Sequence, residues 1–239
     1  MDIRSTFAPT GTLRASINLG NPVLAQGTPE VPSGVTIDIA KELAARLDLP
    51  VEFLCFGAAR ESFEAMKAGK ADLCFLAVDP ARESSVAFTA PYVLIQGVFA
   101  VPIDSPVSTA EAVDREGVRV GVKDGSAYDL FLSRTLVHAQ VVRGEEGVTV
   151  FLEQHLEVAA GIRQPMEDFI RSQGGMRLLE PHFMEIKQAV GIPPSRGHDT
   201  IRFLQEFVEE LKSNGFIAEA LRRSGRTDAT VALPSVSSS

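Results

Sequence analysis

The strongest constraint on the fold is a rhythm of short apolar runs that alternate with amphipathic stretches along the first 80 residues. The runs are typical of strands, and the third is apolar except for Asp72, as expected in a buried parallel sheet. The expected strands are 12–19, 51–56 and 71–78, and the expected helices between them are 35–47 and 62–68. Strand–helix–strand–helix–strand predicts a right-handed βαβ layer.

The same rhythm restarts in the second half, after an extended stretch at 86–102. The expected strands there are 118–122, 156–162 and 183–191, the expected helices are 127–136, 164–173, 200–211 and 216–223, and 141–142 and 148–151 are short apolar pieces. The tail at 229–239 lacks periodicity and is expected to fray. We therefore predict an α/β protein with two layers: lobe 1 from 1–101 and 192–239, lobe 2 from 102–191, and hinges near 101–106 and 190–197. Ligands of such folds bind beyond the carboxyl ends of strands.

Charge and composition exclude several classes of function. The 239 residues carry a formal net charge of −8 without a large basic cluster, so nucleic acid is not an expected partner. The four histidines show no metal-ligand spacing, and no cofactor motif is present, so no metal or cofactor is expected. Cys55 and Cys74 are interpreted as buried thiols, with a disulfide between adjacent strands as the alternative.

Neither a membrane span nor the apolar core of a signal peptide is visible. We therefore expect either a cytoplasmic protein, if the sequence is complete, or a chain from which a signal was removed.

Several motifs resemble one family. The segment ADLCFLAVDPARESSVAFTAPY at 71–92 is similar to the core signature of family-3 solute-binding proteins, which serve amino-acid ABC transporters. Residues 35–47, 118–132 and 212–221 resemble the family's first helix, the opening of its second lobe and its terminal helix. The resemblance implies a two-lobed, periplasmic-binding-protein-like fold of type II with two hinge crossovers. It also implies a periplasmic or extracellular location.

Arg82 is the central residue of the predicted site. In the family, the arginine at this position binds the α-carboxylate of the ligand, and a guanidinium fork matches a carboxylate with two hydrogen bonds. The alternative is an ordinary surface arginine in the charged turn DPARE. The turn Gly125-Ser126-Ala127 can present backbone N–H groups and a hydroxyl to the same carboxylate, with Tyr128 following, or Ser126 can simply cap its own helix.

Other positions line the expected pocket. Asn18 and Asn21 offer amides to a polar ligand, or serve only the turn that they flank. Phe75 and Ala77 lie at the pocket end of the third strand, where Ala77 replaces a Ser or Thr that is common in the family. Gln188 is a further polar contact on the strand into the second connector.

The second lobe departs most from the family. Ile162 occupies the position where many members carry an aspartate for the ligand's ammonium, with Gln164 close behind. Because an unpaired buried ammonium is costly, either Glu157 or Glu185 substitutes, or the ligand is a carboxylate without an amine.

The function predicted is capture of a small carboxylate or amino-acid-like metabolite in a cleft between the lobes. The expected partners are that metabolite and an ABC transporter permease, and the protein is expected to be a monomer. Two alternatives stay open. One is an enzyme on the same scaffold, similar to cyclohexadienyl dehydratase, and the other is a cytoplasmic ligand-sensing module.

Overall fold

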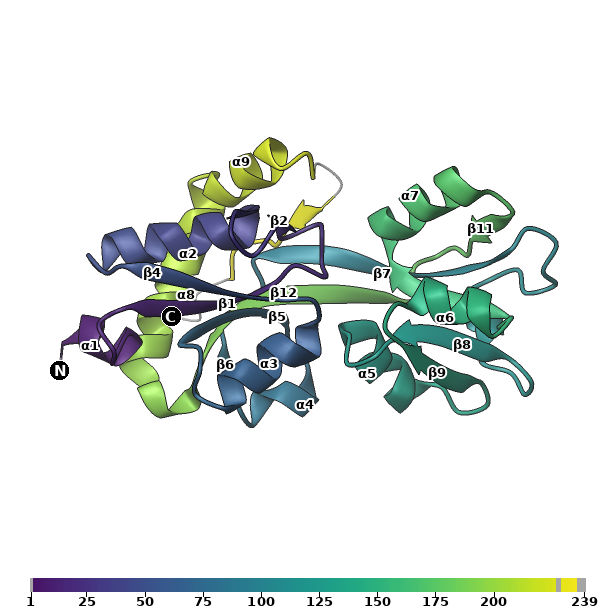
Figure 1. Ribbon diagram of the computed structural model, residues 1–239, viewed down its shortest axis with the longest axis horizontal. Coiled ribbons are helices and arrows are strands. Elements are labelled where there is room, and N and C mark those ends of the chain that lie inside the picture. Colours follow the sequence, from purple (N-terminus) through teal and green to yellow (C-terminus); the bar gives the residue numbers. More distant parts are fainter. Residues whose placement is uncertain (1, 227–228, 236–239) are drawn as a thin grey trace. The chain divides into compact units, whose positions relative to one another are not determined.

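The computed structural model describes residues 2–226 and 229–235 (Figure 1). The chain forms two compact units: unit 1 comprises residues 1–94 and 187–239, and unit 2 comprises residues 95–186. The chain leaves unit 1 within strand β7 and returns within β12. The lobe boundaries and hinge ranges given above stay predictions, because contacts within one conformation do not show where a chain bends.

Unit 1 contains most of the helices, and two strands are shared with unit 2. Its elements are α1 (Ile3–Phe7), β1 (Leu13–Asn18), β2 (Gln26–Gly27), β3 (Pro32–Ser33), α2 (Val35–Arg46), β4 (Val51–Phe56), α3 (Ala59–Lys67), β5 (Leu73–Ala77), α4 (Pro80–Glu83), β6 (Ala87–Phe88), the start of β7 (Val93–Pro102), the end of β12 (Met184–Ile192), η2 (Pro194–Arg196), α8 (His198–Ser213), α9 (Phe216–Arg223) and β13 (Thr230–Val231).

The sheet of unit 1 runs in the order β4-β1-β5-β12. β1 pairs in parallel with β4 and β5, whereas β12 is antiparallel to β5. Helices α2 and α3 cover opposite faces of this sheet, as a right-handed βαβαβ layer requires (Figure 1). Met66 of α3 packs with Cys74 and Leu76 of β5 in one apolar cluster. The predicted βαβ layer is therefore confirmed, and its parallel strands end at one common edge.

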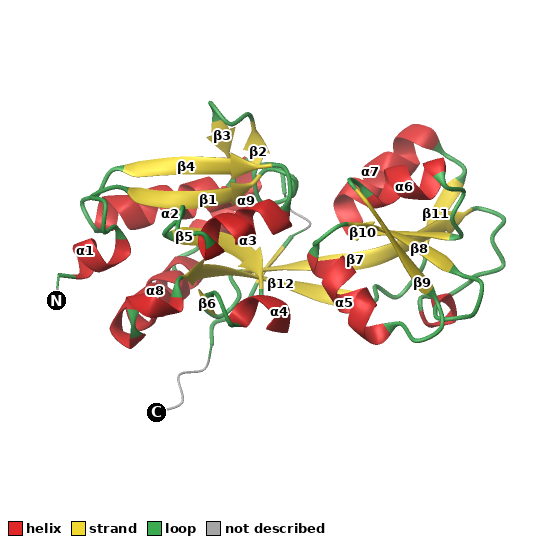
Figure 2. Cartoon of the chain, turned by 60° about the horizontal axis from the view of Figure 1, so that its bottom comes forward, coloured by secondary structure: helices red, strands yellow, loops and turns green. Residues whose placement is uncertain are grey.

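Unit 2 is built from one continuous stretch of chain. Its elements are η1 (Glu111–Val113), β8 (Arg119–Lys123), α5 (Ala127–Thr135), β9 (Gln140–Gly144), α6 (Gly147–Glu153), β10 (Val158–Ile162), α7 (Arg163–Gln173) and β11 (Met176–Leu178), together with the rest of β7 and the start of β12. Its sheet runs β7-β10-β8-β9, in which β10, β8 and β9 are parallel and β7 is antiparallel to β10 (Figure 2). Helices α6 and α7 cover one apolar face, where Val150, Phe151 and Met166 are buried.

The short apolar piece at 148–151 lies within helix α6, where Val150 and Phe151 insert into the core of unit 2, and the piece at 141–142 lies within β9. One local prediction was wrong. The C-terminal tail does not fray over residues 230–235: Thr230 and Val231 form β13, which pairs with Leu94 and Val93 of β7.

The disulfide alternative is also excluded, and both thiols are free. Cys55 lies on β4 and Cys74 on β5, and β1 runs between these two strands. Two strand spacings amount to about 9–10 Å, which is too far for a disulfide.

Candidate functional site

Arg82 lies just beyond the carboxyl end of β5, on the short helix α4. Asp79 caps this helix by accepting a hydrogen bond from the Ala81 N–H at 2.9 Å, and Pro80 occupies the first turn. The Arg82 side chain turns back toward the strand, where Nη1 donates to the Ala77 carbonyl oxygen at 3.0 Å. Only 2% of the residue is exposed. The interpretation of Arg82 as a surface arginine is therefore wrong.

The electrostatics of Arg82 are those of a buried cation. Burial lowers the pKa of its guanidinium, and the nearby Asp79 carboxylate opposes that change. An arginine nevertheless stays charged in proteins, because its intrinsic pKa is far above neutrality. A buried cation is favourable only where hydrogen bonds and opposite charge surround it. The carboxyl end of β5 thus carries a fixed positive charge that suits an anion.

Three other predicted residues gather around the same strand. Ala77 pairs with Gln188 of β12, which is buried. Phe75, two residues earlier on β5, packs edge-on against Tyr92 with ring centroids 6.3 Å apart. The structure therefore brings Arg82, Ala77, Gln188 and Phe75 together in unit 1. The Ala77 carbonyl oxygen accepts a hydrogen bond from Arg82.

Tyr92 was not among the predicted site residues, although it is the last residue of the segment quoted above. Its side chain is fully buried beside Phe75, and burial raises the pKa of its hydroxyl. Among the described residues, this hydroxyl has no hydrogen-bond partner. Its backbone N–H donates to the Gln188 carbonyl at 2.8 Å.

Asn18 and Asn21 serve the turn after β1. The Asn18 side-chain oxygen accepts from Gly20 N at 3.0 Å, and that of Asn21 accepts from Val23 N at 3.2 Å. Asn18 ends β1 at the edge where β5 also ends, since the two strands are parallel. The hydrogen bonds shown by both side chains are those of turn chemistry, which was one of the two interpretations.

In unit 2, the predicted turn lies between β8 and α5. Ser126 caps α5, and its Oγ accepts from the Asp129 N–H at 3.1 Å. Tyr128 is buried, and burial raises the pKa of its hydroxyl. The Ser126 N–H donates to the Lys123 carbonyl. The capping interpretation of Ser126 is therefore confirmed, and it leaves the N–H groups of Ala127 and Tyr128, which by position have no acceptor within the helix.

Asp129 is a site residue that sequence analysis missed. Its buried carboxylate accepts from Gly125 N at 2.9 Å, from Ser133 Oγ at 3.0 Å and from Arg143 Nε at 3.0 Å. These bonds hold the turn, helix α5 and strand β9 together. The sequence does contain a pattern that could have identified Asp129. Ser126 and Asp129 have the spacing of a capping box.

Ile162 and Gln164 mark the carboxyl end of β10. Ile162 is the last strand residue, and α7 starts directly after it. Arg163 between them binds Glu180 through two hydrogen bonds, at 2.7 and 2.9 Å. The side-chain oxygen of Gln164 is buried and, within the described part of the chain, has no hydrogen-bond partner.

The structure also tests the two acids that were offered as partners for an ammonium. Glu157 precedes β10 and pairs with Arg119 at 2.9 Å. It lies five residues before Ile162, about 16 Å away along an extended strand. Glu157 is therefore at the wrong end of the strand to replace an aspartate at Ile162. Glu185 is exposed on β12.

In the described ranges, 2–226 and 229–235, no group of three or more His, Cys, Asp or Glu side chains could hold a metal ion. No helix within these ranges is both long and apolar enough to cross a bilayer.

The two compact α/β units, joined by two crossing strands, define the fold of the type II periplasmic binding proteins. Solved structures of this fold resemble the chain over nearly its whole length. A mutant of ArgBP from T. maritima aligns with a TM-score of 0.76 and 18% identity, covering 93% of this chain and 99% of that one. AbpA from Streptococcus pneumoniae, an amino-acid ABC transporter substrate-binding protein bound to L-arginine, gives 0.76 and 14%, with 93% and 98% covered. The ancestral amino-acid-binding protein AncCDT-1, a precursor of cyclohexadienyl dehydratase, gives 0.73 and 18%, with 92% and 98% covered.

The model of the family described as bacterial extracellular solute-binding proteins, family 3, matches residues 18–226. The chain belongs to this family, as the motifs around Arg82 predict.

Proposed function

We propose that the protein captures a small carboxylate or amino-acid-like metabolite for an ABC transporter, with the Arg82 guanidinium holding the carboxylate. The buried cation at the carboxyl end of β5 carries this proposal. Ligands of open α/β sheets bind at that edge, and a guanidinium there meets a carboxylate without first losing a full water shell. The family and the amino-acid-binding relatives support the same class of ligand.

The second unit contributes through the N-terminus of α5. By their place in the first turn, the N–H groups of Ala127 and Tyr128 lack an acceptor within α5, and the Ser126–Asp129 hydrogen bond caps this turn. Closure of the two units over the ligand, as expected for two-lobed binding proteins, adds these contacts to those of unit 1. Ala127→Pro tests the contribution, because proline removes one of these N–H groups and is tolerated at the first position of a helix.

An amine on the ligand requires an acceptor, and Gln164 supplies one. Its buried side-chain oxygen lies two residues after Ile162, where many family members have an aspartate. A neutral amide favours an ammonium less than a carboxylate does. We therefore expect weaker discrimination between amino acids and plain carboxylates than an aspartate would give, and Gln164→Glu should shift binding toward amines.

The test uses matched pairs of ligands. A thermal-shift screen compares L-amino acids with the corresponding 2-hydroxy acids, and calorimetry follows every compound that raises the melting temperature. Arg82→Ala should weaken binding by about 2–5 kcal/mol, because the ligand carboxylate loses its charged partner. The matched control is Arg222→Ala, since Arg222 is exposed on α9 of the same unit. Equal affinity of wild type and Arg82→Ala would rule out the assignment.

A second candidate is a dehydratase-like enzyme, favoured by the similarity to AncCDT-1. Such catalysis needs a general acid or base beside the ligand. The Glu157 carboxylate is bound to Arg119, which leaves Glu185 of the two acids considered. Incubation with prephenate and arogenate separates the two functions: release of water and carbon dioxide indicates an enzyme, and binding without turnover indicates a solute-binding protein.

The family supports a periplasmic or extracellular location and a transporter permease as partner. The monomeric state stays a prediction, which sedimentation or light scattering of the purified protein can test.

A further inference from the structure

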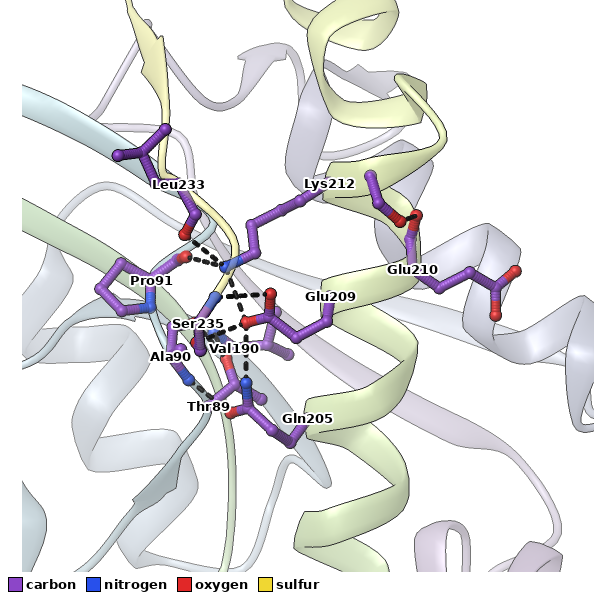
Figure 3. A network of polar contacts seen from close by, with 11 residues as sticks. Thr89, Ala90, Pro91, Val190, Gln205, Glu209, Glu210, Lys212, Leu233 and Ser235 are labelled. Atoms are coloured by element: carbon purple, nitrogen blue, oxygen red, sulfur yellow. Dashed lines mark hydrogen bonds and ion pairs between the residues drawn. The ribbon is translucent and has the colours of Figure 1, made fainter. Parts of the chain in front are cut away.

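Lys212 of α8 carries a buried ammonium group in unit 1. Its side chain is only 1% exposed. The ammonium pairs with Glu209 Oε1 at 2.7 Å and donates to the carbonyl oxygens of Pro91 at 3.2 Å and Leu233 at 3.1 Å (Figure 3). An ammonium has three donors, and three acceptors surround it here. Two of these acceptors come from segments far from α8 in the sequence.

Glu209 binds the C-terminal segment from the other side. Its carboxylate accepts from Ser235 N at 3.0 Å and from Ser235 Oγ at 2.7 Å. Burial opposes ionisation of Glu209, but hydrogen bonds from Lys212 and Ser235 outweigh it, so the pKa of Glu209 is lowered. We call residues 230–235 the strap, because Lys212 and Glu209 both form hydrogen bonds with it.

The same face of α8 holds the segment that enters β7. Gln205 donates to Glu209 at 2.9 Å and accepts from Ala90 N at 2.6 Å. One residue earlier, Thr89 is joined to Val190 of β12 by hydrogen bonds of 2.8 and 3.2 Å. The segment that enters β7 is therefore bonded to α8, and β12 is bonded to that segment.

The strap also extends the sheet at this anchor. Thr230 and Val231 pair with Leu94 and Val93, and Ala232 N donates to the Tyr92 carbonyl at 3.0 Å. Residues 93 and 94 are the last of unit 1 before the chain passes to unit 2. Loss of the strap would remove one acceptor, the Leu233 carbonyl, from the buried Lys212 ammonium. It would also remove both Ser235 donors from the Glu209 carboxylate. We therefore expect the hydrogen bonds of this network to form and break together.

We propose that the strap is a conformational lock on the root of β7. It holds residues 89–94 rigidly on α8, so that bending between the units begins beyond Leu94. Without the strap, the flexible stretch would extend back into unit 1 as far as Thr89.

Hydrogen exchange measured by mass spectrometry tests the lock in the full-length protein and in a variant with a stop codon at Thr230. Amides of residues 89–94 should exchange at least about tenfold faster without the strap, while peptides from β1 and β4 should keep their rates. Unchanged exchange at 89–94 in the folded variant overturns the proposal. The experiment needs no ligand, and its result is therefore independent of the carboxylate site.

If exchange in β1 and β4 is also faster, removal of the strap has unfolded unit 1. Point variants then test the lock. Ala232→Pro deletes the N–H that binds Tyr92, and Glu209→Gln removes the charge that faces Lys212. Both should accelerate exchange at 89–94 alone. Glu210→Gln is the matched control, because its side chain points away from the network in Figure 3 and pairs with Arg46. Equal exchange in Glu209→Gln, Ala232→Pro and Glu210→Gln would contradict the lock.

Discussion

The Asp72 carboxylate accepts two hydrogen bonds from the Arg14 guanidinium, at 2.8 Å from Nε and 2.9 Å from Nη2. Arg196 adds a third, at 2.7 Å from Nη2, and the Asp72 side chain is fully buried. This cluster ties the starts of β1 and β5 to the η2 segment that leads into α8. It lies at the end of the strands opposite to Arg82, and its role is structural.

Asp72→Asn should therefore destabilise unit 1 strongly. The substitution leaves two guanidinium groups facing a neutral amide, and loss of one partner from a buried ion pair costs about 3–5 kcal/mol. Urea denaturation should show this loss. Asp199→Asn, which affects an exposed pair with Arg202, should change the free energy of unfolding by less than about 1 kcal/mol. A similar small effect for Asp72→Asn would show that the cluster contributes little.

Arg82→Met separates binding from stability. Methionine fills a similar volume but leaves the buried Asp79 carboxylate and the Ala77 carbonyl without the guanidinium, so the melting temperature should fall. Carboxylate binding should fall at least about thirtyfold, since about 2 kcal/mol or more is lost. Differential scanning fluorimetry and calorimetry on the same sample measure both effects. A lower melting temperature together with normal affinity would identify Arg82 as a purely structural residue.

The two thiols should differ in reactivity. Burial raises the pKa of Cys74 to about 12, which leaves almost no thiolate at pH 8. Cys55 is only partly buried, and burial raises its pKa as well. Titration with a chromogenic disulfide should therefore detect one slow thiol in the native protein and two in denaturant. Cys55→Ala should abolish the native signal, and fast labelling of Cys74 would contradict its burial.

The Glu157–Arg119 pair should contribute a small acid-sensitive stability to unit 2. Hydrogen bonding from Arg119 lowers the pKa of Glu157 in the folded state. A lowered pKa means that the contribution is present above the unfolded value of about 4.3 and is lost as the pH falls through the folded value. The pair is more than one-third exposed, so screening by solvent keeps its contribution to stability small. Glu157→Gln should lower stability at pH 7 but not at pH 2, as urea denaturation at both pH values can measure.

Sequence patterns predicted the elements whose signals are local. The βαβ layer around β1, β4 and β5 follows from apolar periodicity, and the arginine that follows β5 was located by its motif. Helix α4 carried a local signal as well, because Asp79-Pro80 is a helix start that the description as a charged turn overlooked.

Elements that depend on distant contacts could not be predicted in this way. Residues 148–151 favour a strand locally, but Gly147 lies against the Ala160 carbonyl, where a Cβ would come within 2.6 Å, and this close approach seats a helix on the sheet. The strap looks like a disordered tail until Glu209 and Lys212 are known to face it. Glu157 seemed available for a ligand because sequence alone does not show that Arg119 pairs with it.

The order of the chain through the two units has a consequence for synthesis. Unit 2 is a single stretch, residues 95–186, and it is complete while the last quarter of the chain is still being made. Unit 1 cannot finish folding until the C-terminal residues leave the ribosome. Before then, Asp72 has no Arg196 to pair with, and the segment that enters β7 has neither α8 nor β13 beside it. The half that begins first therefore finishes last, and nascent chains of which only residues 1–190 have left the ribosome should contain a folded unit 2 and an unfinished unit 1.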